Sequence, residues 1–196
     1  MSDLKAQKAS LRERFIKLRG GIGPESRSRR DDEISKAVLE TGAYRSADTV
    51  LIYISSSVEV NTSNLIKQAL DDNKTVAIPY CVPGKRELEF YLFDENTPLR
   101  PNKIGIMEPV PDVNRLVTSF SGSLCIVPAI ACDYEGFRLG YGGGYYDRFL
   151  ARYNGYTIAV VYDNCLTKSL SRGQFDIPVD AVATEKELFT TAKKPL

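Results

Sequence analysis

Residues 138–148 form a glycine-rich run, Arg-Leu-Gly-Tyr-Gly-Gly-Gly-Tyr-Tyr-Asp-Arg, with four glycines between Gly140 and Gly144. Glycine adopts positive φ easily and lets the backbone approach a ligand closely, and a helix that opens at Tyr145 would offer free N–H groups to an anion. Arg138 and Arg148 add positive charge at the two ends of the run. The pattern predicts a cradle for phosphate groups, although a plain tight turn between a strand and a helix has similar glycines.

Asp147 follows the glycines and would lie in the first turn of that helix. The run is not a Walker A loop, because no Lys-Ser or Lys-Thr follows the glycines, and it lacks the spaced dinucleotide fingerprint. A carboxylate beside a phosphate repels it unless a cation lies between them. Since Mg²⁺ typically takes one or two carboxylates plus substrate phosphate oxygens, Asp147 is a candidate Mg²⁺ ligand.

The chain contains no histidine. This absence excludes Ser-His-Asp and Cys-His catalysis, histidine-ligated zinc and imidazole as a general base. We therefore expect no catalytic nucleophile or general base, and assign the chemistry to carboxylates, Lys, Arg, Tyr, backbone amides and a bound metal. Phosphoryl transfer suits this set of groups, because it depends mainly on positioning and charge neutralisation.

The composition is that of an ordinary globular protein, with 196 residues, 43% hydrophobic and 26% charged. The formal net charge of +1 gives no global attraction for nucleic acid or an anionic membrane. No apolar run approaches the roughly 20 residues that span a bilayer, and the N-terminus lacks a signal-peptide core, so we expect a cytoplasmic protein. The four cysteines have no Cys-x-x-Cys spacing, which favours buried free thiols.

Helical and strand patterns alternate along the chain, which predicts an α/β fold: a single three-layer domain with a mainly parallel sheet flanked by helices. The predicted strands are 49–54, 75–80, 88–93, 124–131, 156–162 and 179–183. The predicted helices are 3–19, one from Pro24 to a stop at Gly42, one capped by Asn61 or Thr62, and 145–153, with irregular structure at 94–122. The parallel connection after the first strand places residues 55–60 at a carboxyl end of the sheet, where such folds bind ligands.

Residues 127–129, Asp133 and 138–148 together resemble the signature of the 5-formyltetrahydrofolate cyclo-ligase family, also called 5,10-methenyltetrahydrofolate synthetase. The resemblance extends from Lys8 to Glu185 and implies one such domain over 1–196. It implies closure of 5-formyltetrahydrofolate to 5,10-methenyltetrahydrofolate through phosphorylation of the formyl oxygen, with ATP as co-substrate, Mg²⁺ as cofactor, and ADP and phosphate as products. No obligate protein partner is inferred.

The resemblance also assigns nucleotide contacts along the first helix and the glycine-rich run. The implied ATP-binding residues are Lys8, Arg12, Arg138, Leu139, Gly140, Tyr141, Gly142, Gly143, Gly144, Tyr145 and Tyr146. Lys8 and Arg12 are four residues apart and share one helical face. From the residues alone that face is typical of a solvated basic surface, whereas the family's Lys-x-x-x-Arg pair contacts ATP.

For the folate and the metal, the resemblance points to other positions. The implied substrate-binding residues are Ile54, Glu59 and Tyr145, and the implied metal ligands are Asp147 and Asp176. A carboxylate such as Glu59 can accept two parallel hydrogen bonds from a 2-amino-pyrimidinone edge, although by itself Glu59 could be an exposed loop residue. Asp176 could equally cap a helix or a turn.

The chain departs from the family between residues 165 and 176. Cys165 stands where the family has Gln, and 170–176 matches the family's Leu-Pro-x-Glu-x-His-Asp only at Leu170 and Asp176. Residues 104–109 again resemble the family's Gly-Ile-x-Glu-Pro segment. The departure motivates an alternative, a non-catalytic nucleotide- or folate-binding paralogue with a regulatory or storage role.

RNA binding through the arginines at the start of the second predicted helix is a third possibility. Arg27, Arg29 and Arg30 form a short basic cluster. Asp31, Asp32 and Glu33 follow directly and offset its charge. We therefore expect no nucleic-acid partner.

Overall fold

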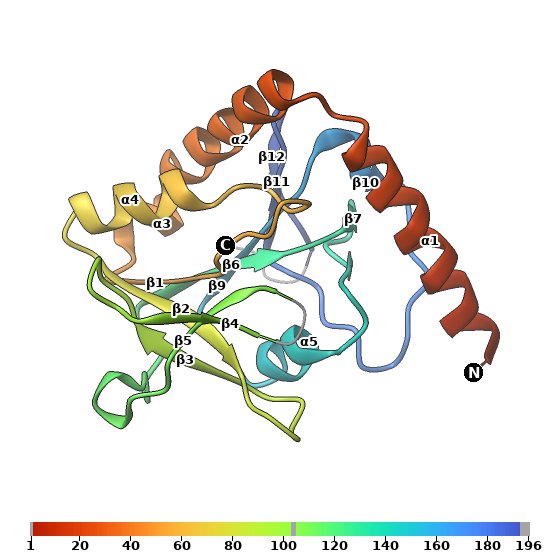
Figure 1. The fold of residues 1–196 in the computed structure, drawn as a ribbon. Helices are drawn as coiled ribbons and strands as arrows, with labels where there is room; N and C mark the ends of the chain where they lie inside the picture. Colours follow the sequence, from red (N-terminus) through yellow and green to blue (C-terminus); the bar gives the residue numbers. More distant parts are fainter. Residues whose placement is uncertain (1, 103–104, 193–196) are drawn as a thin grey trace.

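A computed structural model describes residues 2–102 and 105–192 (Figure 1). Within those residues, a seven-stranded sheet has the order β12-β11-β9-β6-β1-β2-β3. These strands are β12 (Leu188–Thr190), β11 (Ala181–Ala183), β9 (Tyr156–Val160), β6 (Ser123–Pro128), β1 (Thr49–Ile52), β2 (Thr75–Cys81) and β3 (Leu88–Leu92). Neighbours from β11 to β2 are parallel, and the two edge strands are antiparallel. The predicted α/β fold with a mainly parallel sheet is confirmed.

The central strands are apolar on both faces because the sheet is covered on both sides. In β1, Val50 and Ile52 belong to one hydrophobic core and Leu51 to the other. β6 alternates in the same way, with Leu124 in the first core and Cys125 in the second. This alternation produces two separate cores, one on each face of the sheet.

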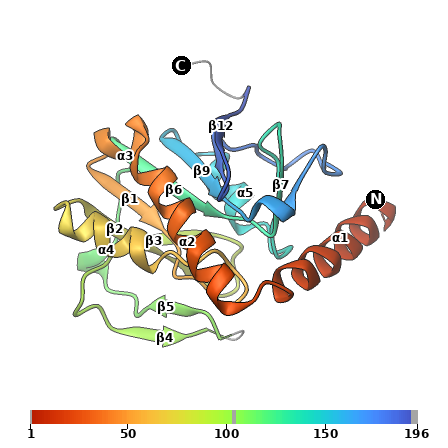
Figure 2. The same ribbon diagram turned by 90° about the horizontal axis from the view of Figure 1, so that it is seen from above.

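Helices cover the two faces unequally (Figures 1 and 2). α2 (Pro24–Leu39), α3 (Gly42–Ser46) and α4 (Ser63–Asp71) cover one face. The other face carries α5 (Tyr145–Leu150) and a small sheet of β10 (Leu166–Thr167), β7 (Ala131–Asp133) and β8 (Arg138–Leu139). α1 (Ser2–Gly20) lies apart from these layers and contacts the 3₁₀ turn η2 (Asp163–Cys165).

Several predicted boundaries were wrong. Gly42 does not stop the second helix: α2 ends at Leu39, and Thr41 caps a new helix by accepting a hydrogen bond from Tyr44 N at 3.0 Å. The predicted strand 124–131 is divided into β6 and β7, and the predicted helix 145–153 ends at Leu150.

The segment 94–122 was expected to be irregular, but it contains three short regular elements. They are β4 (Leu99–Pro101), β5 (Met107–Pro109) and the 3₁₀ turn η1 (Val113–Arg115). β4 and β5 pair as an antiparallel hairpin. Of the segment 104–109 that resembles the family, Ile104 lies outside the described residues.

None of the helices in 2–102 and 105–192 combines the length and apolarity needed to cross a membrane.

The four cysteines are free thiols, as predicted. Cys125, Cys132 and Cys165 are buried, and Cys81 is half-buried. Burial raises the pKa of Cys132 to about 12, and burial together with a hydrogen bond to Glu108 raises the pKa of Cys81 to about 12. Burial also raises the pKa values of the Cys125 and Cys165 thiols.

These raised pKa values predict thiols that alkylating reagents do not modify in the native state. The thiolate is the reactive form, so a thiol with a raised pKa stays protonated and inert at about pH 8. Iodoacetamide should modify none of the four cysteines in the native protein while it modifies all four in urea, as followed by intact-mass measurement. Native labelling of Cys81 or Cys132 as fast as in urea would contradict this expectation.

Candidate active site

The glycine-rich run is a loop between β8 and α5. Gly142 and Gly144 have φ values of 99° and 69°, the left-handed conformation that favours glycine. Gly144 is the N-terminal cap of α5, and a Cβ atom there would lie 2.7 Å from Arg148 Nη1. A Cβ at Gly143 would lie 2.7 Å from the Tyr145 ring. Backbone conformation therefore favours glycine at 142 and 144, and the Tyr145 ring favours it at 143.

The first helix lies against this loop. Arg12 Nε donates a hydrogen bond of 2.7 Å to the carbonyl of Gly140, and a Cβ at Gly142 would be 3.3 Å from Arg12 Cζ. One turn earlier, Lys8 forms an ion pair with Asp176. The face that holds Lys8 and Arg12 is thus packed on the loop region and is not a solvated basic surface. Their contact with ATP stays a prediction.

The two candidate metal ligands lie in one hydrogen-bonded cluster. Asp147 Oδ1 is 3.1 Å from Arg138 Nη2 and accepts a hydrogen bond of 3.3 Å from Ile177 N. Ile177 follows Asp176, whose carboxylate pairs with Lys8 and also accepts a hydrogen bond from Gly173 N at 2.7 Å. Asp176 therefore closes a turn and lies at the site as well. Each candidate ligand has a cationic partner.

Arg138 is buried beneath the loop, and Tyr146 is half-buried with its hydroxyl oxygen inside. The Arg138 side chain is 3% exposed, and its guanidinium lies 5.7 Å from the centre of the Tyr146 ring. Arg138 Nε and the Tyr146 hydroxyl have no hydrogen-bond partner among the described residues. Burial, and to a smaller extent the nearby Cys125 and Glu59, raises the pKa of Tyr146. Arg138 Nε and the Tyr146 hydroxyl are therefore buried polar atoms that a bound ligand could hydrogen-bond.

Glu59 is a buried residue, 6% exposed, so its interpretation as an exposed loop carboxylate was wrong. Its Oε2 accepts hydrogen bonds of 2.8 Å from both the backbone N and the Oγ of Ser56. Tyr141 of the glycine loop is 46% exposed, and its hydroxyl lies beside this carboxylate: partial removal from water first, and then the charge of Glu59, raises the Tyr141 pKa. Ile54, just after β1, is half-buried against the core. The predicted nucleotide and folate residues therefore meet at Tyr141.

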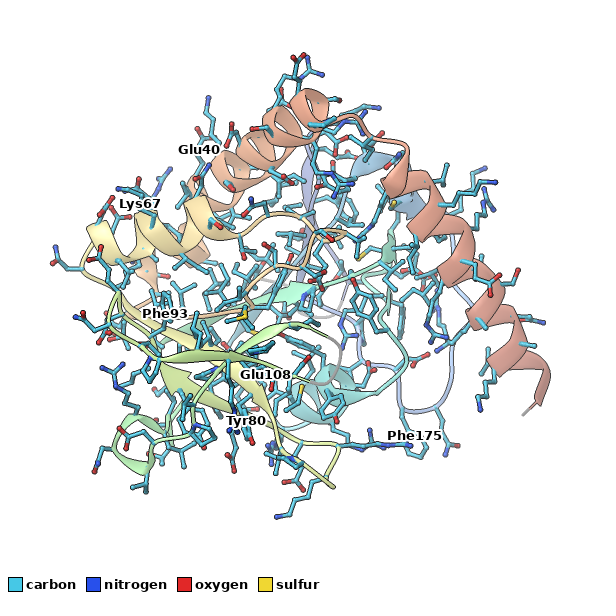
Figure 3. All side chains as sticks on the ribbon, viewed as in Figure 1. Glu40, Lys67, Tyr80, Phe93, Glu108 and Phe175 are labelled. Atoms are coloured by element: carbon cyan, nitrogen blue, oxygen red, sulfur yellow. The ribbon has the colours of Figure 1, made fainter. Side chains whose placement is uncertain are left out.

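The segment 170–176, where the chain departs from the family, is held in place by its own side-chain contacts. Arg172 Nη1 donates a hydrogen bond of 2.8 Å to Glu135, and the Arg172 guanidinium lies 4.1 Å above the Phe137 ring. Ser171 Oγ bonds Gln7 Oε1 of α1 at 3.1 Å. Phe175 is 76% exposed and lies at the periphery of the molecule (Figure 3). The segment is thereby attached to both α1 and the β7–β8 turn.

Two buried charged residues lie near the site without a role from the sequence reasoning: Asp133 was part of the family signature only, and Arg19 was missed. Asp133 has no exposed side-chain surface and accepts hydrogen bonds from the backbone N atoms of Phe137 and Leu170, so it joins the β7–β8 turn to the 170–176 segment. Arg19, in the last turn of α1, is fully buried. Its spacing of seven residues from Arg12 placed it on the same helical face, which was the available signal.

Comparison with known proteins gives consistent matches. The model of the 5-formyltetrahydrofolate cyclo-ligase family matches residues 4–185. The chain is 26% identical to a 5-formyltetrahydrofolate cyclo-ligase of Haemophilus influenzae, covering 88% of this chain and 95% of that protein. It is 29% identical to one of Escherichia coli, covering 87% and 96%. The structure of Aquifex aeolicus 5,10-methenyltetrahydrofolate synthetase superposes with a TM-score of 0.82 at 29% identity, covering 96% and 95%.

The matched region contains β1, the Glu59 loop, the glycine loop and the 170–176 segment. The resemblance found in the short motifs therefore extends over most of the chain and its fold. The chain belongs to the 5-formyltetrahydrofolate cyclo-ligase family, and its activity is that of an ATP-dependent 5-formyltetrahydrofolate cyclo-ligase.

Proposed function

We propose that ring closure takes place at the cluster described above, with ATP on the glycine loop and 5-formyltetrahydrofolate on the Glu59 side. One observation carries the assignment. Arg12 of α1 donates to the carbonyl of Gly140, and beside this contact both candidate metal ligands are paired with cations, Asp176 with Lys8 and Asp147 with Arg138. Residues far apart in sequence thus supply a loop for phosphates, positive charge and carboxylates in one place.

The proposed nucleotide contacts are those of the loop and the first helix. Backbone N–H groups of residues 140–144 would bind phosphate oxygens, and Lys8, Arg12 and Arg138 would neutralise their charge. Tyr145, whose ring lies over Gly143, would be between nucleotide and folate. In the free protein Lys8 pairs with Asp176, Arg12 bonds the Gly140 carbonyl and Arg138 pairs with Asp147. These three cations are therefore already oriented toward the loop.

The donor set fits Mg²⁺, which Asp147 and Asp176 would hold. No group of three or more His, Cys, Asp or Glu residues that could hold a metal occurs among the described residues. The support is the pair of carboxylates itself, because Mg²⁺ takes one or two carboxylates and completes its shell with phosphate oxygens and water. When bound, Mg²⁺ neutralises charge on the phosphates. Release of Lys8 and Arg138 from the carboxylates toward phosphate would keep every charge paired.

The chemistry then needs alignment more than a protein nucleophile. The formyl oxygen attacks the γ-phosphorus and ADP leaves, which gives a phosphorylated imidate. N10 attacks the activated carbon and loses its proton, and the carbon–oxygen bond breaks so that the oxygen departs in inorganic phosphate. The protein contributes by holding the two substrates in line and by stabilising phosphate charge, which suits a chain without histidine.

Glu59 would bind the pterin through its 2-amino-pyrimidinone edge, with Ile54 lining the same pocket. Ser56 fixes the orientation of the carboxylate through two hydrogen bonds to Oε2. Preorganisation of this kind lowers the entropy lost when the ligand binds. The proposal also includes a single domain over 1–196, a cytoplasmic location and no obligate protein partner.

Asp147→Ala should abolish turnover. The variant removes a proposed metal ligand, and loss of one such charge-stabilising group typically costs about 10²–10³ in kcat. The measurement is the near-ultraviolet absorbance of the methenyl product with Mg-ATP and 5-formyltetrahydrofolate. Asp71→Ala is the matched control, because Asp71 is an exposed carboxylate on α4 paired with Lys67. Full activity of Asp147→Ala would refute the metal role.

Glu59→Gln should weaken the folate and spare the nucleotide. Hydrogen bonds to a charged group are worth about 1.5–3 kcal/mol, so KM for 5-formyltetrahydrofolate should rise about 10- to 100-fold. KM for ATP should change much less than KM for the folate, since Glu59 Oε2 accepts from Ser56 and its contact with the glycine loop is through the Tyr141 side chain alone. Initial-rate measurements with each substrate varied decide the matter, and an unchanged folate KM would remove Glu59 from the substrate site.

A further inference from the structure

Arg19 is a fully buried arginine without a carboxylate partner. Its Nη1 donates to the Val58 carbonyl at 3.0 Å, and its Nη2 donates to the carbonyl of Ala129. None of the ion pairs found among the described residues includes Arg19, and its Nε has no hydrogen-bond partner there. Carbonyl oxygens, the Tyr162 ring and the Cys165 thiol surround this guanidinium without a carboxylate, and a buried charge of this kind is costly.

A second arginine holds the neighbouring carbonyl. Arg27 of α2 donates to the Ser57 carbonyl at 2.6 Å and to the Arg19 carbonyl at 2.7 Å. Both guanidinium groups lie 5.7 Å from the centre of the Tyr162 ring. The carbonyls of Ser57 and Val58 directly precede Glu59, so the two arginines fix the backbone that presents this carboxylate.

The other side of Glu59 is fixed as well. Asn61 N donates to Asp31 Oδ1 at 3.1 Å, and the Tyr162 hydroxyl donates to the same oxygen at 2.7 Å. The Glu59 loop is therefore held by α1, by α2 and by the end of β9. Of these, α1 is the element that also reaches the glycine loop.

One helix thus contacts both proposed substrate sites. Lys8, Arg12 and Arg19 are separated by four and seven residues and lie on one face of α1. Arg12 bonds the Gly140 carbonyl and Arg19 bonds the Val58 carbonyl, so the two ends of α1 contact the two loops. Figure 2 shows α1 outside the layered body of the molecule. Phe15, which is 4% exposed, anchors α1 to one hydrophobic core, and Arg12 and Arg19 add its polar contacts to the two loops.

We propose that Arg19 is a positioning residue that couples the two sites through α1. This inference rests on the proposed assignment of nucleotide to Lys8 and Arg12 and of folate to Glu59. A triphosphate bound to Lys8 and Arg12 fixes the position of α1. Through the bond from Arg19 to the Val58 carbonyl, α1 then fixes the Glu59 loop. The folate therefore loses less conformational entropy of the protein when it binds second. Nucleotide tightens folate binding, and folate tightens nucleotide binding by the same factor.

Four titrations of the full-length protein test the coupling. The dissociation constant of 5-formyltetrahydrofolate is measured with and without a non-hydrolysable ATP analogue and Mg²⁺, and that of the analogue with and without folate. In the wild type the analogue should tighten folate about 5- to 150-fold, the usual range of coupling between sites. In Arg19→Gln the ratio should fall to about one, while the affinity for the analogue alone changes less than about twofold.

Lys17→Gln is the matched control, since Lys17 is an exposed cation on the same helix, and its coupling ratio should equal that of the wild type. Arg19→Lys, which keeps the charge, should restore part of the coupling. A merely structural role would lower the melting temperature and leave the ratio intact. A wild-type ratio in Arg19→Gln, or no coupling in a wild type that binds both ligands, overturns the proposal.

Arg27→Gln keeps the test decisive if Arg19→Gln does not fold. Arg27 is half-buried, and its loss removes the bonds to Ser57 and to the Arg19 carbonyl, so the coupling ratio should fall by at least about threefold. An unchanged ratio in this variant refutes the coupling. If the wild type does not bind folate, or if Glu59→Gln binds folate as tightly as the wild type, the site assignment is refuted instead. Failure of the coupling and failure of the site assignment are therefore distinguishable.

Discussion

Two ion pairs organise the site: Lys8 with Asp176 and Arg138 with Asp147. The Arg138 side chain is 3% exposed and Asp147 is 21% exposed, so these charges are largely removed from water and each requires its partner. Together with the hydrogen bond from Ile177 N to Asp147, they attach the first helix, the glycine loop and the 170–176 segment to one another. In the proposed assignment, Mg²⁺ and the phosphates of ATP would replace both sets of partners.

The sheet makes this arrangement possible because parallel strands bring their carboxyl ends to one edge. The Glu59 loop follows β1, and the β7–β8 turn that leads to the glycine loop follows β6, its parallel neighbour. Tyr141 then reaches from the glycine loop to the side of Glu59. The altered segment at 170–176 preserves this geometry, since Arg172 with Glu135 and Ser171 with Gln7 attach it where the family has other residues.

Residue type and periodicity predicted the features that depend on neighbouring residues in the chain. Glycines at 142 and 144 with positive φ, apolar strands buried on both faces and the loop after β1 at the ligand-binding edge followed from residue type and periodicity. Contacts across more than 100 residues did not follow from local patterns: the family resemblance put Arg12 and Gly140 in one site, and helical spacing put Arg19 on the face of Arg12, but neither gave the hydrogen bonds to Gly140 and Ala129. The restart of a helix at Gly42 was missed because Thr41 acts as a cap only in a chain conformation that periodicity does not encode.

This cluster is proposed to close 5-formyltetrahydrofolate at the expense of ATP. This proposal is tested most directly by mixing the purified protein with Mg²⁺, ATP and 5-formyltetrahydrofolate and following the methenyl product by its near-ultraviolet absorbance, with ATP omitted in a parallel sample. We expect an absorbance band that grows only when ATP is present. A flat trace from protein shown to bind both ligands would contradict it and would favour the non-catalytic paralogue, with 170–176 as the segment responsible.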